Sequence, residues 1–229
     1  MMTAKDRLKN YIEARNPLAI ARRNRMRKRL LNKDVTFLTP NCIGGILFHD
    51  LGLKFLSPTV NLMMSQTDFL KFVLNMDAYL GGEFEFFQHP EYTCPCAVLR
   101  AGGVLPDITV HFTHYTSKED ALLKWRERAE RIQKENIFVF MEERDVITKN
   151  DLLELAELQV RGVVVFTCND YPDIQYAVYI PKYHPAGEVG NVLVRNYLDD
   201  SREYEQYFDF VKWFNEADGE GFDVSAFKH

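Results

Sequence analysis

The pattern of apolar and polar positions becomes regular after residue 106. From there, short apolar runs alternate with longer stretches in which apolar residues recur at helical spacing. The pattern predicts strands at 107–112, 136–140 and 162–167, with helices at 117–133 and 149–159 between them. Because alternating strands and helices build parallel sheets, we expect an α/β fold with a mostly parallel sheet and helices packed on it.

The first half of the chain is less regular. Residues 35–38 predict a buried strand, Gly52 closes a short helix, and residues 65–82 predict one longer helix. Residues 83–106 contain strand-like runs that prolines interrupt, so we expect an irregular β region there. Near the C-terminus, the pattern predicts an edge strand and then a closing helix rich in aromatic residues: 176–180 and 201–218.

Charge is distributed unevenly along a chain of 229 residues with a net charge of -5. Residues 1–33 contain 11 Lys or Arg and two acids, a balance of +9, so the remainder carries -14. We divide the chain into a basic N-terminal helical arm, residues 1–33, and a single α/β domain, residues 34–229. A division into two subdomains near residue 106 stays open. The arm either docks on the acidic body or contacts an anionic membrane surface or another anionic partner.

No stretch approaches the ~20 apolar residues that cross a bilayer, so we expect no transmembrane segment. The first residues, MMTAKDRLKNYIEARN, are charged where a signal peptide needs an apolar stretch. Four scattered cysteines fit a reducing compartment. We therefore expect a cytoplasmic protein.

Ligands of open α/β sheets bind beyond the carboxyl ends of the strands, where loops meet helix N-termini. Four stretches that follow predicted strands contain residues suited to chemistry: NCIGG (41–45), HYTS (114–117), MEERD (141–145) and TCND (167–170). We expect the candidate site among them.

The helix predicted at 117–133 carries basic side chains beside its apolar stripe. Trp125 lies in the stripe, and Lys124, Arg128 and Arg131 border it. Two interpretations stay open. The three cations either line a cleft, where they bind phosphate or carboxylate, or cover the margin of the core with their aliphatic stems.

His111 and His114 are three residues apart, so on one strand they would face opposite sides and could not share a metal. If the strand ends near Phe112, then His114 and Tyr115 lie on the loop at its carboxyl end. There His114 could act as a general acid or base, with His111 and Tyr115 in contact with the substrate. A structural role is the alternative for both histidines.

The glycine-rich turn at 41–45 could place Asn41 against a sugar hydroxyl and the backbone of Gly44 and Gly45 against an anion. It matches neither the dinucleotide fingerprint nor the P-loop, and Asn41 could instead close the turn on its own backbone. Cys42 is interpreted as a small buried residue rather than a nucleophile.

Acidic residues cluster at 142–145, where they could ligate Mg²⁺ or Mn²⁺ or supply a base. Asp145 is the one we select for catalysis or for holding a divalent metal, and a plain loop is the alternative. The histidine and cysteines of residues 89–96 lack the spacing of a zinc knuckle, so we predict no zinc site.

Several of these segments resemble, in order, the domain of unknown function 1919 family, bacterial proteins often labelled exopolysaccharide biosynthesis proteins. The resemblance covers roughly residues 20–195, and its most specific parts are Asn-Cys-x-Gly-Gly and His-Phe-x-His-Tyr followed by Lys-Trp-x-x-Arg. This chain has Ile43 where an aromatic residue is usual and Val146 where a glycine is expected. The resemblance implies a role in surface polysaccharide assembly and carries no established chemistry.

Together these features lead to the hypothesis of an enzyme that transfers or modifies a sugar-linked group. Its substrate would be a nucleotide sugar, a sugar phosphate or another anionic glycan precursor, with phosphate held by the basic side chains of the 117–133 helix. The alternative is a non-enzymatic binding or regulatory module for an anionic glycan, a lipid headgroup or a partner protein. Nucleic acid is a weaker possibility because the body is acidic.

Overall fold

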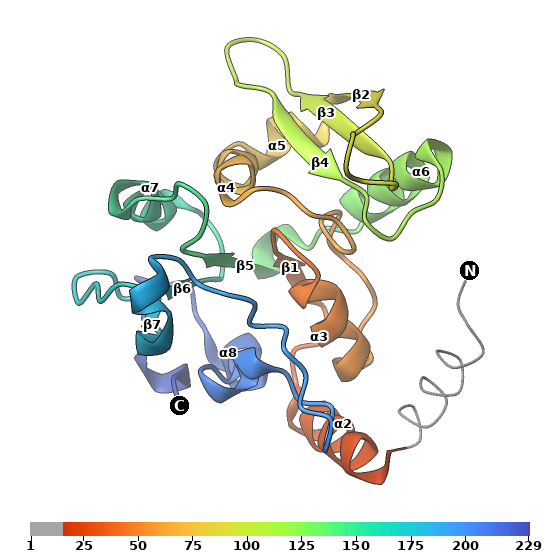
Figure 1. Ribbon diagram of the computed structural model, residues 1–229. Coiled ribbons are helices and arrows are strands. Elements are labelled where there is room, and N and C mark those ends of the chain that lie inside the picture. The colour runs from red at the N-terminus through yellow and green to blue at the C-terminus, as the bar shows by residue number, and fades with distance from the viewer. Residues whose placement is uncertain (1–15) are drawn as a thin grey trace.

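The structure of the protein, a computed structural model, describes residues 16–229 and contains two sheets in that range (Figure 1). The first is parallel with strand order β1-β5-β6-β7: β1 (Thr36–Leu38), β5 (Ile137–Glu142), β6 (Gly162–Thr167) and β7 (Ala177–Tyr179). The second is antiparallel with order β2-β3-β4: β2 (Glu83–Phe87), β3 (Cys96–Arg100) and β4 (Ile108–His111). The first fifteen residues of the predicted arm lie outside the described residues.

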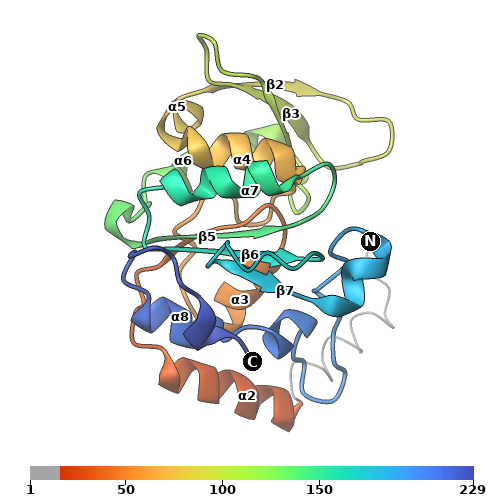
Figure 2. The ribbon, with the colours of Figure 1, turned by 90° about the vertical axis from the view of Figure 1, so that its left-hand side faces the viewer.

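Helices cover both faces of the parallel sheet. Their bounds are α2 (Pro17–Arg29), α3 (Ile43–Leu51), α4 (Gln66–Leu74), α5 (Met76–Leu80), α6 (Lys118–Ala129), α7 (Lys149–Glu154) and α8 (Phe210–Glu216). Figure 2 shows α4 and α7 on the face toward the antiparallel sheet, α3 and α8 on the opposite face, and α2 outside them. This arrangement confirms the expected α/β fold with a parallel sheet. Of the helices described, none has the length and apolar character to cross a membrane.

The strand predicted at 107–112 forms, but it belongs to the antiparallel sheet. β4 pairs with β3, so its placement in the parallel sheet is wrong. The difference is visible in burial: β5 and β6 are buried at every position, whereas β4 alternates between buried and half-buried residues. A parallel strand covered on both faces is apolar throughout, and an alternating strand has one free face. β2 and β3 also pair in regular register within the region expected to be irregular.

The helix predicted across 65–82 is two helices. Ser65 caps the first, because its hydroxyl accepts a hydrogen bond from the N–H of Asp68 at 3.1 Å. Asn75, with φ of -132° and ψ of 37°, leaves the helical region and separates α4 from α5. The closing helix is likewise shorter than predicted.

An aromatic core lies between the parallel sheet and α8. The ring centroids of Phe37 and Phe214 are 5.2 Å apart, and those of Phe138 and Trp213 are 4.7 Å apart. Gly162 begins β6 against this cluster, where an added Cβ would lie 2.8 Å from the Trp213 indole. Only glycine fits that contact without a shift of the ring, so the C-terminal helix packs directly on the strand.

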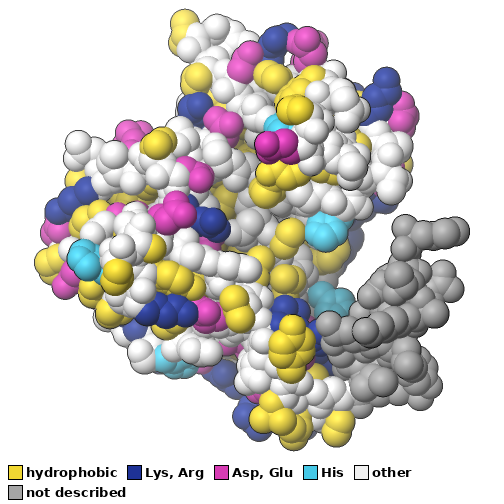
Figure 3. Space-filling view, viewed as in Figure 1, with side chains coloured by type: hydrophobic (Ala, Val, Ile, Leu, Met, Phe, Trp, Pro, Cys, Tyr) yellow, Lys and Arg dark blue, Asp and Glu magenta, His cyan; other side chains and the backbone are white. Residues whose placement is uncertain are grey.

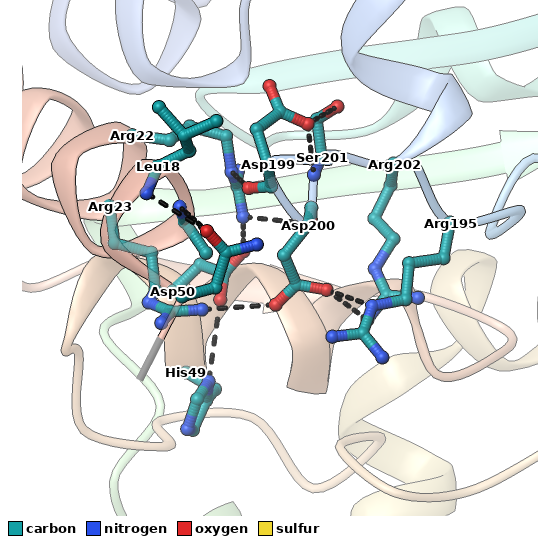
Figure 4. Close-up of polar contacts among 12 residues, drawn as sticks. Leu18, Arg22, Arg23, His49, Asp50, Arg195, Asp199, Asp200, Ser201 and Arg202 are labelled. Atoms are coloured by element: carbon teal, nitrogen blue, oxygen red, sulfur yellow. Dashed lines mark hydrogen bonds and ion pairs between the residues drawn. The ribbon is translucent and has the colours of Figure 1, made fainter. Parts of the chain in front are cut away.

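The described part of the basic arm docks on acidic residues of the body (Figure 4). Arg22 pairs with Asp50 of α3 and with Glu205, and Arg23 pairs with Asp200 at 3.0 Å. These acids come from segments far apart in the sequence, so α2 joins an early helix to the C-terminal region.

Apolar side chains of the arm also enter the core. Ala19, Met26 and Leu30 are buried. The docked interpretation therefore holds for residues 16–33. Residue 106, near which a division was left open, lies in the connection between the paired strands β3 and β4, and the buried side chains of both sheets form one cluster.

Replacing Asn16 with alanine should lower the free energy of unfolding by about 1 kcal/mol, because it removes the cap of α2. The Asn16 side-chain oxygen accepts from the N–H groups of Leu18 and Ala19 at 3.0 and 3.4 Å, and its Nδ2 donates to the carbonyl of Leu198 at 2.8 Å. Urea unfolding measures the change. Asn16→Asp keeps the accepting oxygen and should recover most of the loss; equal stability of all three proteins would show that this cap does not hold α2.

Candidate functional site

The carboxyl ends of β1 and β5 lie at one edge of the parallel sheet, and their polar side chains are in contact. Asn41, in the loop after β1, donates from Nδ2 to Oε2 of Glu142, the last residue of β5. Gln66 of α4 donates to the same oxygen at 3.5 Å, and its Oε1 accepts from the N–H of Glu142 at 3.1 Å. One loop and one helix start therefore converge on the carboxyl group at the end of β5.

Glu142 is only 1% exposed. Burial raises the pKa of its carboxyl to about 7, although the charge of Arg144 and the hydrogen bond from Asn41 act in the opposite direction. A carboxyl with a pKa near neutrality can accept or release a proton at physiological pH, and such groups concentrate at functional sites. The sequence pattern predicts Glu142 only as one acid of a cluster. Its position at the end of a fully buried strand is the signal that could have found it.

A cysteine and a histidine lie in contact next to Asn41. Sγ of Cys42 is 3.3 Å from Nε2 of His114. Cys42 is half-buried immediately before α3, and His114 is exposed on the loop after β4. Burial raises the pKa of the Cys42 thiol, and a hydrogen bond with Thr113 partly opposes it. The interpretation of Cys42 as merely a small buried residue missed this contact.

Gly44 and Gly45 belong to the first turn of α3, where N–H groups have no carbonyl partner within the helix. An added Cβ would lie 2.9 Å from Oγ1 of Thr39 at Gly44 and 2.7 Å from Oδ1 of Asn61 at Gly45. Both glycines therefore let the start of α3 approach the neighbouring loops closely. Their expected role as backbone donors to an anion stays a prediction.

The loop after β5 contains a fixed acid and an unpaired cation. Asp145 has a positive φ of 57°, and its Oδ2 accepts a hydrogen bond from the N–H of Gln66 at 2.9 Å, which ties the loop to α4. Arg144 is half-buried, and its side chain has no hydrogen-bond or ion-pair partner within residues 16–229. In the sequence, only the acids of this loop were selected as candidates, and Arg144 was not among them. The catalytic role assigned to Asp145 stays a prediction.

Glu143 fills the space between the ends of β5 and β6. Its Oε2 accepts from the N–H groups of Cys168 and Asn169 at 2.8 and 3.1 Å, and its Oε1 accepts from the Asn169 amide at 2.8 Å and from the Tyr171 hydroxyl. Burial acts to raise the pKa of Glu143, but these hydrogen bonds outweigh burial and lower it. Glu143 is therefore an ionised structural carboxylate that joins the loops after β5 and β6.

Arg128 lies inside the protein rather than along a cleft. The residue is 7% exposed, and its Nη1 donates to the carbonyl of Val60 and to the hydroxyl of Tyr115, both at 2.7 Å. Its guanidinium carbon is 5.3 Å from the ring centroid of Phe55. Arg128 and Tyr115 thus join the loop around residue 60 to the loop after β4. The interior satisfies the guanidinium, which favours a structural role for Arg128. The substrate-binding roles of Arg128 and Tyr115 stay predictions.

Lys124 of α6 and Arg131, in the turn after it, both pair with the partly exposed Glu127, at 3.0 and 3.3 Å. A phosphate would have to compete with that carboxylate. On the face shown in Figure 3, Lys and Arg side chains are interspersed with Asp and Glu rather than gathered in one patch. The structure favours the interpretation that these cations cover the margin of the core.

His111 lies apart from His114. Its Nδ1 is 3.4 Å from Sγ of Cys96, and its ring packs against His89 and Tyr92. Burial and the charge of His89 lower the pKa of His111. Among the residues that the structure describes, no group of three or more His, Cys, Asp or Glu side chains is arranged to hold a metal ion.

Comparison with known proteins identifies relatives across most of the chain. A family model described as a domain of unknown function, DUF1919, matches residues 14–215. A protein of Haemophilus influenzae, itself described as uncharacterized, is 35% identical over 192 residues, which cover 84% of this chain and 89% of the relative. The chain therefore belongs to the DUF1919 family.

Proposed function

We propose that the protein is a transferase that modifies an anionic sugar precursor, such as a nucleotide sugar or sugar phosphate, at the carboxyl edge of its parallel sheet. The observation that carries this proposal is the buried carboxyl of Glu142, with a pKa of about 7 and an amide clamp formed by Asn41 and Gln66. Cys42 and His114, in contact with each other, border the same edge. A neutral acid beside these groups suits proton transfer during a group-transfer reaction.

The anionic substrate is inferred from the charges at this edge. Arg144 lies at this edge, where its charge acts on Glu142, and within residues 16–229 its side chain makes no hydrogen bond or ion pair that would compete with a bound anion. A guanidinium offers phosphate two parallel hydrogen bonds. The first turn of α3 supplies backbone N–H groups at the same edge. The resemblance to proteins labelled for exopolysaccharide biosynthesis favours a sugar-linked phosphate among possible anions.

Arg144→Ala should weaken the binding of an anionic sugar precursor by about 10- to 100-fold, since hydrogen bonds to charged groups contribute about 1.5–3 kcal/mol. Isothermal calorimetry with UDP-glucose, UDP-N-acetylglucosamine and glucose 1-phosphate measures this. Arg131→Ala is the matched control, because it removes the same charge from the turn after α6, and it should leave binding unchanged. The proposal fails if no compound of the panel binds, or if the two variants lose affinity equally.

The alternative of a binding module that works through the basic arm has less support. Within residues 16–33, Arg22, Arg23 and Arg29 pair with acids of the body, so their charges are not free for a partner. Arg27 donates from Nε to the carbonyl of Asp50 at 2.8 Å. The described part of the arm, residues 16–33, thus packs on the body, and the carboxyl edge is the better candidate for ligand binding.

A further inference from the structure

The contact between Cys42 and His114 has a chemistry of its own. Cysteine sulfur and an imidazole nitrogen within 3.3 Å form the pair that nucleophilic catalysis uses, with histidine as the base. The two residues come from loops 72 positions apart, one at the start of α3 and one after β4. Burial raises the pKa of Cys42. The thiol therefore keeps its proton at rest, and His114 must remove it as the sulfur attacks.

We propose that Cys42 is a catalytic nucleophile and His114 its base, and that the transferred group is an acyl group. The inference deepens the proposed function, on which it rests, by naming the group transferred to the sugar. A sulfur nucleophile with an imidazole base belongs to acyl transfer. Cleavage of a glycosidic bond by glycoside hydrolases uses a pair of carboxylates that flank the reacting carbon instead. Here Glu142 lies beneath Asn41 and Glu143 is saturated with hydrogen bonds, so neither offers that arrangement.

The donor is inferred to be an acyl thioester, and the reaction has two balanced steps. In the first, Nε2 of His114 takes the Cys42 proton while Sγ attacks the acyl carbon. A bond from that carbon to Cys42 forms, the bond to the donor sulfur breaks, and the donor thiolate leaves with the proton from His114. In the second step, a sugar hydroxyl gives its proton to His114 and attacks the Cys42 thioester. The ester forms, the bond to Cys42 breaks, and the Cys42 sulfur recovers the proton.

The surrounding groups suit the tetrahedral intermediates of both steps. The intermediate carries its negative charge on the former carbonyl oxygen, and donors at a helix N-terminus stabilise such a charge. The N–H groups of Gly44 and Gly45 lie two and three residues beyond Cys42 in the first turn of α3. Asn41 fixes the start of that turn, because its Oδ1 accepts from the N–H of Ile43 at 3.0 Å while its amide donates to Glu142. Asn41 thus links the Glu142 carboxyl, the proposed proton-transfer acid, to the turn that carries Cys42.

Alkylation of the intact protein by iodoacetamide tests the pair without any sugar. Cys94 is an internal control, because it is half-buried like Cys42, whereas Cys96 and Cys168 are buried. Peptide mass spectrometry at about neutral pH should show Cys42 alkylated at least about tenfold faster than Cys94. His114→Gln should slow the alkylation of Cys42 by about tenfold or more and leave the rate at Cys94 unchanged.

An unchanged or faster alkylation of Cys42 after replacement of His114 overturns the proposal. If His114 only covered the thiol, then His114→Ala would expose the sulfur, and Cys42 would react at the same rate or faster. A second measurement uses p-nitrophenyl acetate, which should leave one acetyl group on Cys42 in the wild type and none at that position in Cys42→Ser or His114→Gln. Absence of acetylation at Cys42 in the wild type also overturns it. Neither result depends on sugar binding, so failure of the calorimetry with Arg144→Ala remains a separate outcome.

Discussion

Arg128→Leu should lower the free energy of unfolding by about 4 kcal/mol. The guanidinium is buried, and leucine would leave the carbonyl of Val60 and the hydroxyl of Tyr115 without their shared donor. Each unpaired buried group costs about 1–3 kcal/mol, and the contact with the Phe55 ring adds about 1 kcal/mol. Arg128→Lys keeps the charge but not the planar fork, so we expect an intermediate loss.

Urea unfolding measures this loss, and Arg126→Leu is the matched control. Arg126 lies on the same helix but is exposed, and its replacement should change the free energy of unfolding by less than about 0.5 kcal/mol. Equal effects at positions 126 and 128 would contradict the structural role of Arg128. A stable Arg128→Leu protein that had lost only ligand binding would restore the cleft interpretation.

Glu142→Gln should make the protein more stable than the wild type at pH 8, by about 3 kcal/mol, and no more stable at pH 4. Burial raises the pKa of Glu142 to about 7 from an ordinary value of 4.5, so the folded chain holds this proton more tightly than the unfolded chain. Protonated Glu142 contributes fully to the free energy of unfolding below pH 4.5, and this contribution is lost as the pH rises through 7. Glutamine cannot ionise, and each pKa unit of difference is about 1.4 kcal/mol.

Urea unfolding of the wild type and Glu142→Gln from pH 4 to pH 8 tests this prediction. Glu143→Gln is the matched control with the opposite sign. The pKa of Glu143 is lowered, so its carboxylate stabilises the fold above the ordinary pKa, and its replacement should destabilise the protein at pH 8. If the free energies of unfolding of the wild type and Glu142→Gln changed equally with pH, the pKa of Glu142 would not be raised. The proposed function would then lose its main support.

The elements of the parallel sheet could be predicted because their information is local. β5 and β6 are short runs of apolar residues, and the pattern alone predicts buried strands. The partner of β4 could not be derived in this way, since pairing with β3 depends on residues such as Ala97 opposite Val110. The alternation of apolar Ile108 and polar Thr109 indicates an antiparallel strand. The regular order of strands and helices after residue 106 led instead to the parallel assignment.

The expectation that ligands bind beyond the carboxyl ends of the strands selected the loops of the candidate site but not the contacts among their side chains. These loops contain Asn41, Cys42 and His114. The expectation could not show that Cys42 and His114 touch, because they are joined only through the fold. Neighbouring side chains Glu142 and Glu143 have the same chemistry in the sequence. Burial raises the pKa of Glu142, whereas the hydrogen bonds to Glu143 lower its pKa, and both effects depend on the fold.

The order of the parallel sheet also constrains how the chain folds as it is made. β1 pairs with β5 about one hundred residues later, with Thr36 opposite Ile137, and Arg22 of α2 meets Glu205 across 183 residues. Contacts of such long sequence separation form slowly. During synthesis, β1 therefore has no strand partner until β5 has been made, and Arg22 has no contact with Glu205 until the segment after β7 has been made. The nascent chain is exposed to aggregation in that interval.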